Sequence, residues 1–173
     1  MNLNLNVDLI SLKRNVGHQE AICVGLNYFF MQKKTCDIAV VMDSDGEDAP
    51  KNIKYLVNSL QSSDHDVFVA SRRKRSESWK FKFFYKIYKF GFSILTGKSI
   101  DFGNFFCIKR DALEKFLEYP EISIHLAGAL IRSKLSIGFE LLDRTPRYSG
   151  SSKMNFQNLV LHGFRAFMVF AED

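Results

Sequence analysis

The sequence predicts an α/β fold in which helices flank a mostly parallel sheet. Apolar, β-branched runs that are typical of buried strands occupy residues 38–42 and 66–70. Apolar residues recur at helical spacing before and between them, in residues 18–34 and 50–61. This alternation favours parallel strands joined by right-handed crossovers. The 173 residues are enough for one domain that buries a core.

Weaker patterns complete the expected order of elements. Apolar and polar residues alternate in residues 6–12, which predicts a first strand there. The remaining patterns predict strands at 99–108 and 137–142 and helices at 110–118, 121–133 and about 155–171.

Residues 79–95 form an unusually apolar predicted helix. Lys82, Lys86 and Lys89 lie in one narrow stripe, and phenylalanine, tyrosine and isoleucine cover the rest of its girth. Such a helix packs in a core or between subunits, or it lies in a membrane interface with its lysines toward the headgroups. The pattern alone leaves these alternatives open.

Two carboxylates, Asp43 and Asp45, follow the predicted strand 38–42 directly. Ligands of open α/β sheets bind at the carboxyl ends of the strands. Carboxylate oxygens at this spacing suit Mg²⁺ or Mn²⁺, which share their shell with substrate phosphates. The same stretch is also good turn chemistry, with Asp48 as a helix N-cap before Pro50. A metal–diphosphate site and a simple turn therefore both remain open.

Two cationic segments could bind phosphate. Residues 71–75 leave the predicted strand 66–70 at the sheet edge where Asp43 and Asp45 lie. Residues 144–153 combine glycine, serine, arginine and lysine in a predicted loop. Taken singly, each segment is equally well a solvated basic loop or a polar linker.

Composition narrows the partners. The net charge of +5 favours anionic partners such as phosphates or anionic lipid. Nucleic acid is not expected, because the aromatic residues recur at helical spacing rather than as a stacking platform. The three cysteines form no CxxC pair, so neither a disulfide framework nor a zinc site is indicated.

Five stretches, taken in order, resemble the motifs of family 2 glycosyltransferases. They are Asn15-Val16-Gly17 with Ala21 and Gly25; Met42-Asp43-Ser44-Asp45 with Asp48 and Pro50; Ser71-Arg72 with Arg75 and Glu77; Gly103-Asn104-Phe105 with Arg110; and Arg147 with Gly150, Ser152 and Lys153. Their order and spacing are similar to the polyprenyl-phosphate branch, which includes dolichol-phosphate mannose synthase and bactoprenol glucosyltransferases.

The resemblance implies a GT-A fold and an inverting transfer of a sugar from a UDP- or GDP-sugar to a polyprenyl phosphate. It implies that Asp45 acts in catalysis and that Asp45 and Asp43 bind Mg²⁺ or Mn²⁺. It also implies that Asp43, Asp45 and Arg72 bind the nucleotide-sugar. It implies that Arg75 binds a phosphate group or the acceptor. It implies the same phosphate- or acceptor-binding role for Arg147, Ser152 and Lys153.

The chain departs from the resemblance at two points. Asn104 stands at a catalytic position where many members have aspartate. A phosphate acceptor is largely ionised near neutral pH, with a second pKa of about 6, so transfer does not require a strong base. The first, base-binding strand of the family is absent, so we expect an N-terminally incomplete domain that starts near its second strand. A truncated, non-catalytic remnant that acts as an interaction or membrane-associated subunit is the alternative function.

These implications set the remaining expectations. Residues 1–153 are expected to form the transferase domain and residues 154–173 a C-terminal amphipathic helix that leads toward a membrane region. The partners implied are the sugar donor, the lipid acceptor and a membrane surface at its cytoplasmic face. A homo-oligomer is left open, and the sequence does not identify the sugar or the base.

Overall fold

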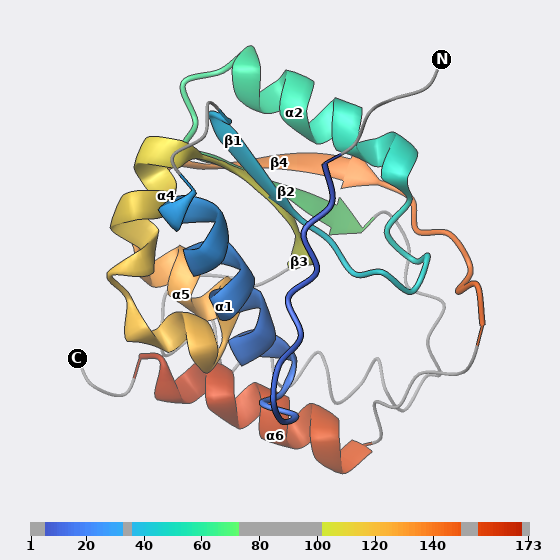
Figure 1. Cartoon of the computed structure of the whole chain (residues 1–173), viewed down its shortest axis with the longest axis vertical. Helices are drawn as coiled ribbons and strands as arrows, with labels where there is room; N and C mark the ends of the chain where they lie inside the picture. The colour runs from blue at the N-terminus through green and yellow to red at the C-terminus, as the bar shows by residue number, and fades with distance from the viewer. Residues whose placement is uncertain (1–5, 33–35, 73–101, 150–155, 171–173) are drawn as a thin grey trace.

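A mixed sheet forms the centre of the molecule (Figure 1). The structure is a computed structural model, and it describes residues 6–32, 36–72, 102–149 and 156–170. The sheet has the order β1-β3-β2-β4, with the strands β1 (Ile38–Val41), β2 (Val67–Arg72), β3 (Phe102–Lys109) and β4 (Ile137–Leu142). β3 is antiparallel to β1 and β2, and β4 is parallel to β2. The carboxyl ends of β1, β2 and β4 therefore share one sheet edge with the start of β3.

Helices cover both faces of the sheet (Figure 1). One face carries α2 (Ile53–Gln61), which follows the short 3-10 helix η1 (Pro50–Asn52). The other face carries α1 (His18–Met31), α4 (Arg110–Leu117), η2 (Pro120–Ser123), α5 (Leu126–Arg132) and α6 (Phe156–Met168). Together the layers confirm the predicted α/β fold class. Of the helices described, none is both long and apolar enough to cross a membrane.

β3 is one of the two inner strands, and both of its faces are apolar. Phe106 and Ile108 pack into the core on the α1 side, whereas Phe105 and Cys107 pack against α2. Side chains such as Phe106 are completely buried, and the burial of each one stabilises the fold by roughly 1.5–3 kcal/mol. A continuous apolar run thus becomes a strand that is covered on both sides.

Most predicted elements are confirmed, with shifts at their ends. The predicted strands 38–42, 66–70, 99–108 and 137–142 correspond to β1, β2, β3 and β4. The single helix predicted at 121–133 is divided into η2 and α5. His125 lies at the division with extended backbone, and its ring accepts a hydrogen bond from the Gly128 N–H at 3.0 Å. The predicted helix at 79–95 lies outside the described residues.

Two predictions about the sheet are wrong. Residues 6–12 contain no strand, and the side chains of Val7 and Leu9 are 82% and 92% exposed. Alternation predicts a strand only where a neighbouring strand supplies hydrogen bonds, and here no described strand pairs with this segment. The simple parallel succession of β1 and β2 is also wrong, because β3 lies between them in antiparallel orientation.

Candidate active site

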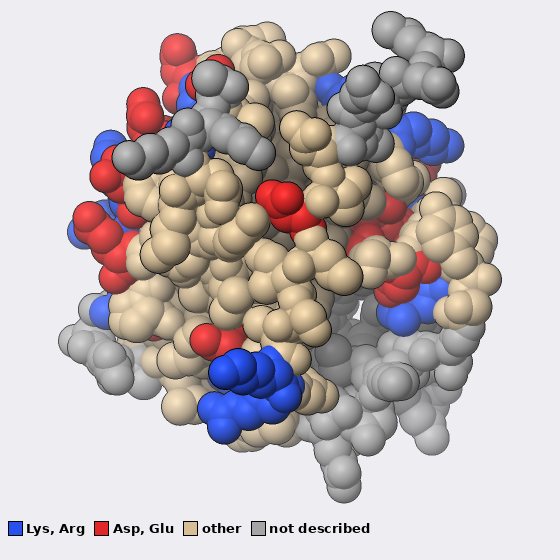
Figure 2. All heavy atoms as spheres, in the orientation of Figure 1, with Lys and Arg blue, Asp and Glu red and all other residues tan. Residues whose placement is uncertain are grey.

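Two loops from the outer strands of the sheet meet beside its carboxyl edge. Residues 42–49, the acidic loop, follow β1, and residues 143–149, the basic loop, follow β4. The N–H groups of Thr145 and Tyr148 donate to the carbonyls of Glu47 and Asp45, at 3.1 and 3.0 Å. Acidic and basic side chains consequently lie in contact on the right of the face in Figure 2.

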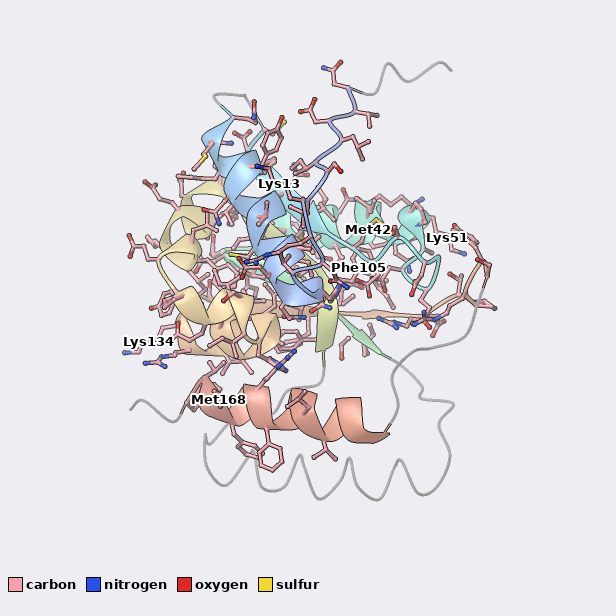
Figure 3. All side chains as sticks on the ribbon, turned by 60° about the horizontal axis from the view of Figure 1, so that its bottom comes forward. Lys13, Met42, Lys51, Phe105, Lys134 and Met168 are labelled. Atoms are coloured by element: carbon pink, nitrogen blue, oxygen red, sulfur yellow. The ribbon has the colours of Figure 1, made fainter. Side chains whose placement is uncertain are left out.

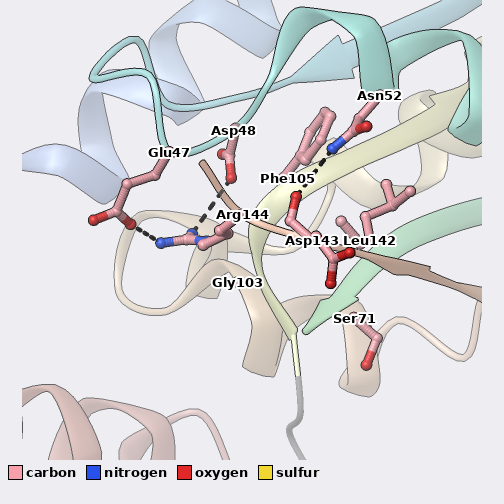
Figure 4. A pocket seen from close by; sticks show the side chains of 10 residues that line it. Glu47, Asp48, Asn52, Ser71, Gly103, Phe105, Leu142, Asp143 and Arg144 are labelled. Atoms are coloured by element: carbon pink, nitrogen blue, oxygen red, sulfur yellow. Dashed lines mark hydrogen bonds and ion pairs between the residues drawn. The ribbon is translucent and has the colours of Figure 1, made fainter. Parts of the chain in front are cut away.

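Two arginines of the basic loop bind the carboxylates of the acidic loop. Arg147 Nη1 lies 3.2 Å from Asp45 Oδ2, and its Nε donates to Glu47 Oε1 at 2.7 Å. Arg144 pairs with Glu47 Oε2 and lies 3.4 Å from Asp48 Oδ1 (Figure 4). The hydrogen bond to Glu47 raises the pKa of the Arg147 guanidinium. Glu47 thus bridges both arginines.

Asp48 is buried and stabilises the acidic loop through a hydrogen bond to its backbone. Its side chain is only 3% exposed, and its Oδ2 accepts the backbone N–H of Asp43 at 3.1 Å. Burial raises the pKa of Asp48, against the opposing effects of the Asp43 N–H and the Arg144 charge. The prediction that Asp48 caps a helix is wrong, because Ala49 is the residue that precedes η1.

Gly46 lies in the turn that positions the carboxylates of Asp45 and Glu47. Its φ is +91°, and a Cβ there would lie 2.7 Å from the ring of Tyr148. Asp45 Oδ1 accepts the Glu47 N–H at 2.9 Å, which is the side-chain hydrogen bond typical of an Asx turn. Asp45 therefore takes part in the turn and in the charged cluster at the same time.

The opposite side of Asp43 faces α1 and β3. His18 Nε2 lies 3.3 Å from Asp43 Oδ1 and 2.7 Å from Asn104 Nδ2. Behind them, the buried Gln19 accepts the Leu126 N–H at 2.7 Å and donates to Asn104 Oδ1 at 3.4 Å. Because a backbone N–H can only donate, the bond from Leu126 fixes which end of the Gln19 amide is its oxygen. The Gln19 NH₂ then faces the oxygen of Asn104, so the NH₂ of Asn104 points toward His18. Asn104 thus presents a hydrogen-bond donor at this position.

A small pocket opens between the two loops and the ends of β2 and β3 (Figure 4). Asn52 of η1 donates to the Asp143 carbonyl at 3.3 Å and holds the basic loop against one wall. Ser71 and Gly103 form the opposite wall, where the pairing of β2 with β3 shifts register. Such irregular pairing ends a regular ladder and leaves room beside a site.

Comparison with known proteins now decides the family. The family profile described as Glycosyl transferase family 2 matches residues 1–119, which is more than half of the chain. The chain belongs to glycosyl transferase family 2. Membership implies a GT-A fold, and it confirms the predicted family and fold.

Two curated proteins that resemble the chain are also named as glycosyltransferases. An uncharacterized glycosyltransferase of Synechocystis sp. is 25% identical over 158 residues, which cover 90% of this chain and 48% of that protein. YkoT, an uncharacterized glycosyltransferase of Bacillus subtilis, is 24% identical over 173 residues, which cover 97% of this chain and 49% of that protein. The chain spans about half the length of these relatives.

Glycosyltransferases of family 2 generally use a divalent metal. Within the described part of the chain, no group of three or more His, Cys, Asp or Glu residues is placed to hold a metal ion. Asp43 and Asp45 nevertheless fit a metal that takes its other ligands from phosphates and water. The guanidinium of Arg147 already lies against Asp45 Oδ2, so this carboxylate is oriented toward positive charge.

The structure brings together some of the predicted site residues. Asp43, Asp45 and Arg147 lie in the two facing loops, and Asn104 joins them through His18. Arg72 ends β2 at the same edge, and only its backbone is described. Arg75, Ser152 and Lys153 lie outside the described residues.

Three residues of the site were not singled out by the sequence patterns: His18, Glu47 and Arg144. The usable signal for Arg144 is its place two residues after the end of a strand, the same context that points to Asp43. His18 and Glu47 carry no such signal, because His18 meets Asn104, 86 residues further along the chain, and Glu47 meets Arg147, 100 residues further along.

Proposed function

We propose that the transferase moves a sugar from a UDP- or GDP-sugar to a polyprenyl phosphate with inversion. The observation that supports this most is the meeting of the acidic loop with the basic loop at one sheet edge. A donor diphosphate with its cation needs carboxylates, and a second phosphate needs guanidinium groups. One edge of this sheet carries both.

Asp43 and Asp45 would hold Mg²⁺ or Mn²⁺ from the acidic loop. Such an ion, when bound, neutralises the charge that develops on a leaving diphosphate. Arg147 would bind phosphate from the basic loop, together with Ser152 and Lys153. Arg72 and Arg75 would contribute at the donor and acceptor phosphates.

Asn104 suits a phosphate acceptor. In an inverting transfer, the acceptor oxygen forms its bond to the anomeric carbon as the bond to the diphosphate breaks. A polyprenyl phosphate brings an ionised oxygen to this step, so a carboxylate base is not required. The NH₂ of Asn104 would instead donate a hydrogen bond that holds an anionic group near Asp43 and His18.

A membrane surface is the proposed location, at its cytoplasmic face. Four apolar side chains of α6 are 41–61% exposed and lie on one side of the helix: Val160, Leu161, Phe164 and Met168. Figure 3 shows α6 below the other described helices, with Met168 on it. An exposed apolar stripe on an amphipathic helix is suited to a membrane interface, where the lipid acceptor lies.

Calorimetric titration of UDP and GDP, with and without Mn²⁺, tests the donor site. We expect metal-dependent binding to the wild-type chain and its loss in Asp45→Ala, because Asp45 would lose both cation-binding oxygens. Asp64→Ala is the matched control, since Asp64 is an exposed carboxylate outside the two loops. Equal binding by Asp45→Ala and the wild type would remove the acidic loop from the proposed site.

A further inference from the structure

Arg147 occupies the oxygen of Asp45 that a metal ion would use. Its Nη1 lies 3.2 Å from Asp45 Oδ2. The other oxygen, Oδ1, accepts the Glu47 N–H at 2.9 Å and is held by the turn. Oδ2 is the oxygen that the turn does not use, and a cation that binds Asp45 through Oδ2 must take the place of the guanidinium.

We propose that Arg147 and the metal of the donor compete for Asp45, so that metal binding releases Arg147 toward a phosphate. The inference rests on the proposed function, because it assigns the order of events at that same site. Without metal, the guanidinium pairs with Asp45 and Glu47. With metal bound, the guanidinium is free for bidentate contact with phosphate.

The two arginines of the basic loop differ in how easily they can leave. Arg144 reaches Asp48, whose side chain is 3% exposed, so its departure would leave a buried carboxylate without that charge. Arg147 reaches Asp45 and Glu47, whose side chains are 29% and 22% exposed. Solvent-accessible pairs of this kind are weak, so a divalent cation on Asp45 and a phosphate on the guanidinium can together replace them.

The basic loop need not detach when Arg147 leaves. The N–H groups of Thr145 and Tyr148 remain bonded to Glu47 and Asp45, and Arg144 remains on Glu47. Release is thus a side-chain movement on a loop that stays in place. By thermodynamic linkage, a phosphate that captures Arg147 tightens metal binding by the same factor by which metal tightens phosphate binding.

The test measures the affinity of Mn²⁺ for the full chain without nucleotide, by electron paramagnetic resonance of free Mn²⁺. Arg147→Met removes the competing charge, and Arg144→Met removes the same charge from the same loop without touching Asp45. We expect Arg147→Met to bind Mn²⁺ roughly fivefold more tightly than the wild type, the factor that corresponds to about 1 kcal/mol. The gain should exceed that of Arg144→Met at least threefold. Circular dichroism confirms that both variants fold.

A second measurement follows the released guanidinium. At saturating Mn²⁺, Arg147→Met should bind either UDP or farnesyl phosphate more weakly than the wild type, and the ligand affected identifies the phosphate as donor or acceptor. A residue that only supports the loop would weaken metal and phosphate binding together, so opposite signs are the signature of competition.

The outcomes separate this inference from the proposed function. Equal gains in Mn²⁺ affinity for both variants, or no Mn²⁺ binding by any chain, would overturn the competition. Undiminished affinity for both phosphate ligands would overturn the release. Metal-dependent binding of UDP or GDP by the wild type supports the transferase function in either case, and its absence counts against that function even if Arg147→Met tightens Mn²⁺ binding.

Discussion

Gly46 is the residue on which the geometry of the acidic loop depends. Its φ of +91° lies where residues with a Cβ are strained, and the ring of Tyr148 fills the space where a Cβ would project. The glycine therefore lets two loops approach closely enough for Arg147 to reach Asp45 and Glu47.

We expect Gly46→Ala to lower the free energy of unfolding by about 1–3 kcal/mol, because it adds backbone strain and a clash with Tyr148. Gly25→Ala is the matched control. Gly25 lies inside α1 with open space at its Cβ position, so alanine should stabilise by roughly 0.5–1 kcal/mol. Urea unfolding of both variants measures the two effects, and equal effects would contradict this account of Gly46.

At the scale of elements, Arg110 holds the end of α1 against β3. Its Nη2 donates to the carbonyls of Phe30 and Gln32 at 2.7 and 2.8 Å, and its guanidinium lies 5.5 Å from the rings of Phe29 and Phe30. Carbonyls at the end of a helix lack intrahelical partners, and a cation there satisfies them. Arg110 belongs to a stretch that resembles a transferase motif, yet its contacts here are with the helix end.

Arg110→Ala should therefore destabilise the fold by about 2 kcal/mol, since it removes charged hydrogen bonds and the packing of the arginine stem. Arg14→Ala, at an exposed arginine, serves as the control and should change stability little. Thermal unfolding gives the stability, and calorimetry with UDP and GDP gives the nucleotide affinity. A loss of affinity in folded Arg110→Ala, with unchanged stability, would show that Arg110 acts at the site instead.

The whole molecule presents its apolar α6 stripe away from the sheet. Ala166 and Val169 on the other side of this segment are buried in the protein, and Arg132 donates to the Val169 carbonyl. The helix is thus docked by one face while Phe164 and Met168 are 61% and 59% exposed. A docked amphipathic helix can bring the site to a lipid surface without entering the hydrocarbon.

Co-sedimentation with vesicles of phosphatidylcholine and phosphatidylglycerol tests this orientation. We expect the double variant Phe164→Ser with Met168→Ser to partition onto the vesicles about tenfold less than the wild type, because two apolar side chains no longer leave water. Leu9→Ser changes an equally apolar and more exposed residue elsewhere, and it should bind like the wild type. Equal partitioning of all three proteins would contradict a role for α6 at the membrane.

The sequence by itself determined the four described strands and most of the helices, because those signals are periodic and local. It also placed Asp43 and Asp45 at the carboxyl edge of the sheet, where open α/β sheets bind their ligands, since a carboxylate directly after a buried strand has few other places to be. The same local logic failed for residues 6–12, because alternation does not state which strand will pair with it.

Only the tertiary structure decided how the site is assembled. It inserted β3 antiparallel between β1 and β2, which brings Asn104 to His18 and Asp43. It also joined Glu47 to Arg147, 100 residues further along the chain. Pairings of this kind depend on strand order and loop packing rather than on spacing. No periodic pattern in the chain encodes them, and they alone place a guanidinium where the metal of the donor is proposed to bind.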